Sequence, residues 1–383
     1  RFLFLASGFV HRLFWIPAAL IPLFIIPNQH HAVIWSVTIL ITVSSVAYSV
    51  NMVAFNSWMG DLVPEEIAGR FFGIRNLVGN ITGGIAALAL GVYLDRVNNF
   101  NGFAIVFLVG VLFGALEVVA YFFIDHPPMA LDEEKPSLLY ILTEPLKNGN
   151  YRKFVLFATL FAFSVNISMP FFNVYMIENL KMSYLSIGLA DNIAFSIGAV
   201  IMVHRWGVLS DRFGNKPVVM VNGLMIASIP ILWLFVNPSN SFAIVFLSNF
   251  VSGIVWSGYN LTIFNQSVWL APEKNRSAYI ASYTLFTSVI GTALANVCGG
   301  YFMQTFGSWI NLLRLPFIAG ETLNSYQVLF VCSGILRILS VLLFLPMVYE
   351  KNSASAKTMI RETTGSLRNI TIRKKRSKND AKK

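Results

Sequence analysis

The stretch Gly207-Val208-Leu209-Ser210-Asp211-Arg212-Phe213-Gly214-Asn215-Lys216 decides the fold, because it is a short polar turn set between two long apolar runs. Glycine lets the backbone turn tightly and lets two helices approach closely. Asp211 is a fixed negative charge that can accept backbone hydrogen bonds or pair with a cation on a neighbouring helix. The stretch therefore predicts a helical hairpin with a charged corner.

The apolar runs on either side of this turn belong to a larger set. Hydrophobic residues make up 56% of the chain and charged residues only 12%, against about 25% charged in an ordinary soluble domain. Runs of about 20 apolar residues can span a bilayer, and helices are expected because barrel strands would alternate in polarity. Ten runs fit, at 2–27, 33–59, 72–94, 102–124, 153–178, 187–206, 217–236, 241–269, 278–305 and 326–349.

The basic residues predict how these spans are oriented. If both ends of the sequence and the loops near 60–75, 125–153, 205–216 and 270–276 are cytoplasmic, that side carries 23 of the 28 Lys and Arg residues and the other side three. Such an imbalance is typical of the positive-inside rule. The tail 350–383 supplies +8 of the formal charge of +10, so the charge indicates contact with anionic lipid headgroups and no nucleic-acid partner. We expect this tail to be disordered.

Two parts of the chain repeat each other about two hundred residues apart. Such a parallel repeat in a membrane chain predicts two halves around a central solute site. Asn51, Phe55 and Asn56 recur 209 positions later as Asn260, Phe264 and Asn265. Pro64, Glu65, Gly83, Ala87, Gly91 and Tyr93 recur 208 positions later as Pro272, Glu273, Gly291, Ala295, Gly299 and Tyr301.

The turn and the repeat together resemble the major facilitator superfamily, whose signature loop combines glycine, Asp-Arg, a second glycine and a basic residue. The segment Lys216–Gly223 aligns with Arg1–Gly8 at an offset of 215, so we expect two further helices before Arg1. The resemblance implies an all-α membrane fold with ten of twelve helices present in two pseudo-symmetric bundles. The expected parts are an N-terminal bundle 1–125, a cytoplasmic linker 126–152, a C-terminal bundle 153–349 and the tail 350–383.

In that family the signature loop packs against the other half and closes the cytoplasmic side. The corresponding partner segment here begins near Arg70 and Arg75. We therefore expect Asp211 to pair with one of these two arginines in the closed state. The alternative is a turn that only sets topology. The predicted gating residues of the loop are Gly207, Asp211, Arg212, Gly214 and Lys216.

Polar residues deep in apolar runs are costly and therefore point to a site for a solute. Three runs carry such residues on one helical face, since offsets of 4, 7 and 11 return to nearly the same direction. The alternative is that these amides join neighbouring helices, an interaction of under about 2 kcal/mol. The candidates for solute binding are Tyr48 and Asn51, Asn166 and Asn173, and Asn249, Trp256 and Asn260.

Four ionisable residues, Arg12, Glu117, Asp191 and Arg337, fall within the apolar runs. Glu117 lies well inside its run and is the candidate for proton coupling. Arg12 is expected either to form a structural ion pair with Glu117 or to contact an anionic group. Asp191 lies a turn inside its run, where an outer-mouth or helix-capping role is expected.

The sequence carries no motif for catalysis, nucleotide binding or a metal. Its five histidines lack metal-ligand spacing, and its two cysteines both lie in apolar runs. We therefore expect the protein to be a monomeric secondary transporter in the cell membrane, with no enzymatic activity and no cofactor. Its expected partners are a small-molecule substrate, a coupling proton or cation and membrane lipids. Amides and aromatic rings suit a neutral polar solute such as a sugar, while the many Phe and Met residues leave efflux of lipophilic compounds as the alternative. A non-transporting receptor or sensor of the same fold is the third reading.

Overall fold

The computed structural model describes residues 2–24, 30–63, 65–124, 138–272, 275–313, 322–351 and 353–363, in which helices are joined by short connecting segments. Within these ranges no β-strand occurs, and ten helical stretches are long and apolar enough to cross a membrane. The all-α membrane fold predicted from hydropathy is confirmed. The stretches are Phe2–Ile21, Ala32–Met52, Leu77–Arg96, Phe100–Phe123, Gly149–Glu178, Tyr184–Phe213, Asn215–Phe235, Ser241–Trp269, Arg276–Ile310 and Ser325–Met347.

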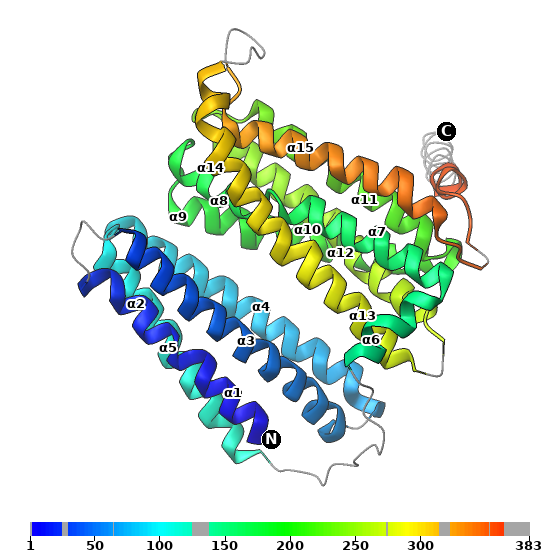
Figure 1. The fold of residues 1–383 in the computed structure, drawn as a ribbon, viewed down its shortest axis with the longest axis horizontal. Helices are drawn as coiled ribbons and strands as arrows, with labels where there is room; N and C mark the ends of the chain where they lie inside the picture. Colours follow the sequence, from blue (N-terminus) through cyan, green and yellow to red (C-terminus); the bar gives the residue numbers. More distant parts are fainter. Residues whose placement is uncertain are drawn as a thin grey trace, which may run out of the picture. The chain divides into compact units, whose positions relative to one another are not determined.

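The chain divides into two compact units, called here unit 1 (Arg1–Glu133 with Ser183–Gly188) and unit 2 (Glu134–Met182 with Leu189–Lys383). Figure 1 labels their helices. Unit 1 holds α1 (Phe2–Leu13), α2 (Trp15–Phe24), α3 (His30–Leu62), α4 (Glu65–Arg96), α5 (Phe100–Ala120) and the short α9 (Tyr184–Gly188). Unit 2 holds α6 (Leu138–Lys147), α7 (Gly149–Asn166), α8 (Met169–Glu178), α10 (Phe195–Phe213), α11 (Asn215–Leu232), α12 (Ser241–Trp269), α13 (Arg276–Ser288), α14 (Ala295–Leu313) and α15 (Ser325–Leu339).

In unit 1, aromatic side chains join α1, α3 and α5. The rings of Phe4, Phe55, Trp58 and Tyr121 lie within 5.8 Å of one another in the measured pairs, and Val118 is fully buried beside them. Rings at such separations attract beyond the area that they bury. This cluster fixes one end of α1 against its two neighbours.

In unit 2, glycines bring α10 and α12 together, and the two helices run side by side (Figure 1). A methyl group added at Gly198 would strike the Phe250 carbonyl oxygen, and one added at Gly253 would strike the Phe195 carbonyl oxygen. Only residues without a side chain permit this approach. The contact holds the middle of α12 against the start of α10.

Two kinds of irregularity interrupt the long helices of unit 2. The segments Leu189–Ala194, Val289–Leu294 and Ser340–Phe344 are π-helical, a form that often marks functional positions. Helix α7 ends at Asn166 and α8 begins at Met169 with Pro170 in its first turn. Pro230 lies inside α11. Each proline removes one backbone donor and leaves a carbonyl of the preceding turn without its usual partner.

The turn between α10 and α11 is held by the segment that follows α15. Gly214 has a φ of 91°, a conformation that favours glycine. The Glu350 carboxylate accepts from the backbone N–H groups of Asn215 (3.0 Å) and Lys216 (2.6 Å), so it caps α11. The predicted helical hairpin with a charged corner is therefore present.

The tail predicted to be disordered from residue 350 begins with a helix instead, over residues 356–363. Met359 is 2% exposed and packs against Trp206, Phe213 and Val218. Burial of this apolar side chain stabilises the helix, which composition alone did not reveal because basic residues dominate the tail. The basic run that follows lies outside the described residues.

Candidate functional site

A cavity of about 290 Å³ lies within unit 2, between α7, α8, α10, α11, α12 and α15. Its wall combines a carboxylate, a guanidinium, amides, hydroxyls and aromatic rings, the mixture expected of a site for a small polar molecule. The lining residues are Val165, Met169, Phe172, Asn173, Met176, Asp191, Phe195, Ile229, Trp233, Ser248, Asn249, Ser252, Trp256 and Arg337.

Asp191 reaches the cavity from the π-helical segment that leads into α10. The side chain of Asn249 on α12 hydrogen-bonds to the Asp191 carboxyl group, and its amide also donates to the Val245 carbonyl at 3.2 Å. The glycine contact between α10 and α12 holds these two side chains near each other. The carboxyl group is half-buried, so it keeps acceptor capacity for a ligand.

Arg337 on α15 is the second charged residue of the cavity lining and is only 4% exposed. Its Nη1 donates to the Ile226 carbonyl at 3.1 Å, and its Nη2 donates to Ser168 Oγ at 3.3 Å and to the Val165 carbonyl at 3.5 Å. Pro230 explains the first acceptor, because the residue four positions after Ile226 has no N–H to donate. The guanidinium thus binds backbone carbonyls left open at helix irregularities.

Aromatic side chains make up much of the remaining wall. Trp233 Nε1 donates to Ser248 Oγ at 3.1 Å, so this indole is fixed with its polar atom satisfied. The Phe172 ring stacks on Phe330 with centroids 4.1 Å apart. Trp256 contacts Tyr259 edge-on at 5.5 Å. These rings present rigid faces to whatever occupies the cavity.

Three of the residues predicted for solute binding, Asn173, Asn249 and Trp256, line this cavity. Two others do not. The Asn166 amide donates to the Ala162 carbonyl of its own helix at 2.8 Å, and Asn260 is exposed. Asp191 and Arg337 were not predicted to bind the solute. Both residues lie inside apolar runs, and this position was the available signal. For Arg337 a second signal was available, because Pro230 and Pro170 lie near the two carbonyls that it binds.

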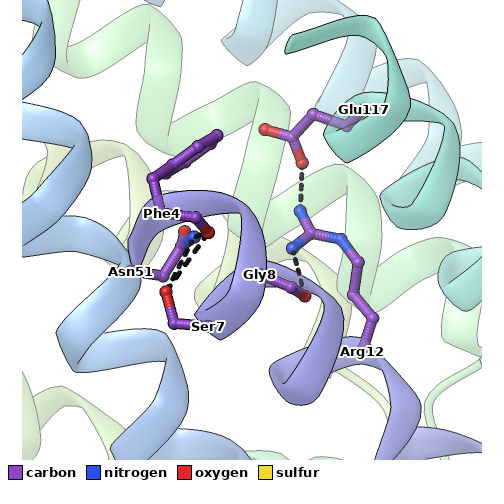
Figure 2. A network of polar contacts seen from close by, with 6 residues as sticks. All are labelled: Phe4, Ser7, Gly8, Arg12, Asn51 and Glu117. Carbon is purple, nitrogen blue, oxygen red and sulfur yellow. Dashed lines mark hydrogen bonds and ion pairs between the residues drawn. The ribbon is translucent and has the colours of Figure 1, made fainter. Parts of the chain in front are cut away.

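In unit 1, Tyr48 and Asn51 have a different environment. The Asn51 amide donates to the Phe4 carbonyl at 2.7 Å and to Ser7 Oγ at 3.5 Å, joining α3 to α1 (Figure 2). The Tyr48 ring lies 5.0 Å from the His11 ring. Asn51 is 5% exposed and its donors are used within the helix pair, as in the helix-joining alternative.

Arg12 and Glu117 form an ion pair between α1 and α5 (Figure 2). Arg12 also donates to the Gly8 carbonyl at 3.1 Å. The Glu117 side chain is 52% exposed and lines a second cavity of about 720 Å³, together with Arg75 and Tyr121. Arg12 is thus the cationic partner of a carboxylate that is open on one side, and coupling by Glu117 stays a prediction.

The signature loop contacts the chain segments around the tail helix. Arg212 pairs with Glu362 at 2.6 Å, and Lys216 Nζ donates to the Val348 carbonyl at 2.6 Å. Asp211 is exposed. Arg75 lies over the Phe55 ring, 4.5 Å from its centroid. The side chain of Arg70 lies outside the described residues, and an Asp211 pair with either arginine would join the two units, so this pairing stays a prediction.

Apolar helices of membrane-spanning length around a cavity with polar groups are typical of a membrane transporter. Comparison with known proteins identifies the family. Residues 154–377 match the model of the Major Facilitator Superfamily. This match spans more than half of the chain, which therefore belongs to that superfamily, as the signature loop predicted. A comparison with curated protein sequences gave no match.

Solved structures support the same fold. The chain is similar to a crystallised mutant of the nucleoside transporter NupG, with a TM-score of 0.68, 15% identity and coverage of 91% of this chain and 83% of that one. It is also similar to a bacterial homolog of the human lysosomal transporter Spinster in an inward-facing, unoccupied conformation, with a TM-score of 0.59, 16% identity and coverage of 91% and 84%. Together, the family match and the ten apolar helical stretches show that the chain is a multi-pass membrane protein of a transporter family.

Proposed function

We propose that this chain is a secondary transporter that binds a small polar solute of no net charge in the cavity of unit 2 and moves it by alternating access. The observation that carries the proposal is the convergence of Asn173, Asn249 and Trp256 on one cavity. Two amides supply hydrogen bonds and an indole supplies a stacking face, the combination that a solute with many polar groups needs. A sugar is one solute of this kind.

Coupling in this proposal uses a proton or another cation, with Glu117 as the group that takes up the proton and Arg12 as its counter-ion. His11, Arg75 and Tyr121 also lie in the electrostatic environment of this carboxylate. The proposed protein works as a monomer in the plasma or inner membrane, in contact with lipids. The loops rich in Lys and Arg and both ends of the sequence face the cytoplasm.

The direct test is uptake into liposomes that contain the purified protein, with and without an imposed proton gradient. Asn249→Ala and Asn173→Ala should each reduce uptake at least about tenfold, because a buried polar group on the solute would lose its partner. Asn296→Ala is the matched control, since Asn296 is an exposed amide on α14 away from the cavity. Equal uptake by all three variants would remove the cavity as the binding site.

Efflux of lipophilic compounds is the second candidate function, and one observation favours it. Met169, Met176, Phe172, Phe195 and Ile229 give the cavity a large apolar surface. Thioether and phenyl side chains adapt to ligands of varied shape. Extrusion of a lipophilic cation from loaded liposomes, with no uptake of polar solutes, would favour this function. Binding with no movement in either direction would favour a receptor or sensor.

A further inference from the structure

The cavity of unit 2 contains two opposite formal charges that do not neutralise each other directly. Asp191 enters it from one end of α10 and Arg337 from α15. Both lie among the described residues, and they form no ion pair with each other. A charge held away from water is costly unless it is paired and hydrogen-bonded. The cavity is therefore neutral in sum but carries two separate charged groups.

Arg337 has hydrogen-bonding capacity left over. A guanidinium carries five N–H donors, and three hydrogen bonds account for part of this set. Its acceptors are two carbonyls and a hydroxyl, none of which carries a negative charge. The Nε atom is buried and has no partner in the described part of the chain. A solute acceptor that bears a negative charge would supply the missing counter-charge to the part of this guanidinium that lines the cavity.

Asp191 has the complementary deficit. Its partner is the neutral Asn249 amide, and the aromatic ring of Trp256 lines the same cavity. A carboxylate and an aromatic face that line one cavity suit a cation, because the ring face attracts positive charge and the carboxylate pairs with it. A neutral hydroxyl would fill the space but would leave the charge uncompensated.

We propose that the solute is a small zwitterion, whose carboxylate binds Arg337 and whose ammonium group binds Asp191. This inference rests on the proposed function and names the solute class for the same cavity. The volume of about 290 Å³ lies at the lower end of ligand sites, which suits a molecule the size of an amino acid. The rings of Phe172 and Phe195 would cover its apolar part. A sugar has no net charge either, but it brings no charged group to either residue.

The test uses the full-length protein and three probes that differ by one charged group. L-Leucine carries both groups, isoamylamine lacks the carboxylate, and isocaproate lacks the amine. Leucine should raise the melting temperature of the protein and enter the liposomes, while each single-charge analogue should bind at least about tenfold more weakly. Glycine, L-phenylalanine and glycine betaine extend the series in size. An analogue with one charge that binds as tightly as leucine overturns the proposal.

Two variants assign the charges to their residues. Asp191→Asn should weaken leucine binding and leave isocaproate binding unchanged, whereas Arg337→Gln should weaken leucine and leave isoamylamine unchanged. The charge-matched controls are Glu144→Gln and Arg205→Gln, which lie in unit 2 but do not line the cavity. If Arg337→Gln does not fold, Arg337→Lys keeps the charge and should retain the preference for leucine over isoamylamine. If each variant weakens the binding of all three probes equally, the assignment of the two solute charges to Asp191 and Arg337 is overturned.

The outcomes also separate this inference from the proposed function. If D-glucose is taken up and none of the four zwitterions binds, the solute class is wrong but the chain remains a transporter. If no solute of either class crosses the liposome membrane in either direction, the proposed function fails first.

Discussion

In each unit, one arginine links two helices that correspond between the units. In unit 1 the arginine lies on the first helix of the pair, and in unit 2 it lies on the second. By the repeat, α1 corresponds to α11. In the expected pair of pseudo-symmetric bundles, α5 corresponds to α15, because these are the last long spans of the two halves. In unit 1 the arginine is Arg12 on α1, and it pairs with a carboxylate on α5 (Figure 2). In unit 2 the arginine is Arg337 on α15, and it binds a carbonyl on α11. The repeat therefore preserves the cross-link but not its chemistry.

Glycine contacts show that the two links occupy corresponding levels. A methyl group on Gly8 would meet Val118 at 3.1 Å, and one on its repeat mate Gly223 would meet Val341 at 2.9 Å. Four residues beyond each glycine stand Arg12 and Ala227, and four residues before each valine stand Gly114 and Arg337.

Each unit thus places one arginine opposite one small residue, with the roles exchanged. In unit 1 the side chain of Arg12 passes directly over Gly114, where even one added carbon atom would clash with it. Unit 1 therefore has an ion-paired, half-exposed carboxylate, to which our proposal assigns the coupling proton. Unit 2 has a buried guanidinium that forms no ion pair with any described residue, and to this group our proposal assigns the solute.

The largest effect is expected from Arg337→Met. The substitution leaves the buried Ile226 carbonyl without its side-chain donor, at about 1–3 kcal/mol, and removes one of two donors to the Val165 carbonyl. It also removes the proposed cationic contact to the solute. Uptake should be abolished and the melting temperature should fall. Arg12→Met is the matched variant in unit 1 and should destabilise less, because its partner Glu117 is half exposed. Equal losses in the two variants would break the distinction between the units.

A strong effect is also expected where the units must work together. Asp211→Arg should cripple transport if Asp211 pairs with Arg70 or Arg75 in the closed state. A second change, Arg70→Asp or Arg75→Asp, should restore part of the uptake by reversing the pair. Measured uptake in the single and double variants decides this. Normal uptake in Asp211→Arg, or no rescue by either second change, would leave the loop as a turn that only sets topology.

A more selective effect is expected from Glu117→Gln. Glutamine keeps the shape of the side chain but binds no coupling proton, so solute exchange across the membrane should continue while uphill uptake stops. Asp191→Asn, its counterpart in the cavity of unit 2, should weaken exchange and uptake together because it acts on binding. The measurement is counterflow of labelled solute beside gradient-driven uptake. Uphill uptake that survives in Glu117→Gln would exclude this carboxylate from coupling.

The fold was predictable because span length and apolarity are local properties of the sequence. The cavity-lining positions of Asn249 and Trp256 on α12 were also predictable, since these residues follow regular helical spacing. Arg337 was not, because its role depends on carbonyls opened in other helices near Pro170 and Pro230. Asp191 was not, because a π-helical turn changes the direction of its side chain from that of a regular α-helix.

The smallest effect is expected at Asn51 and Asn260, which are equivalent positions of the repeat but have different environments. Asn51 is buried and joins two helices, whereas Asn260 is exposed. Asn51→Ala should therefore lower stability by about 1 kcal/mol, since it removes an interhelical hydrogen bond. Asn260→Ala should leave the melting temperature unchanged within error. If both variants melt alike, the two amides are equivalent after all, and identical residues in the two repeats would then have kept identical roles even where the arginines exchanged theirs.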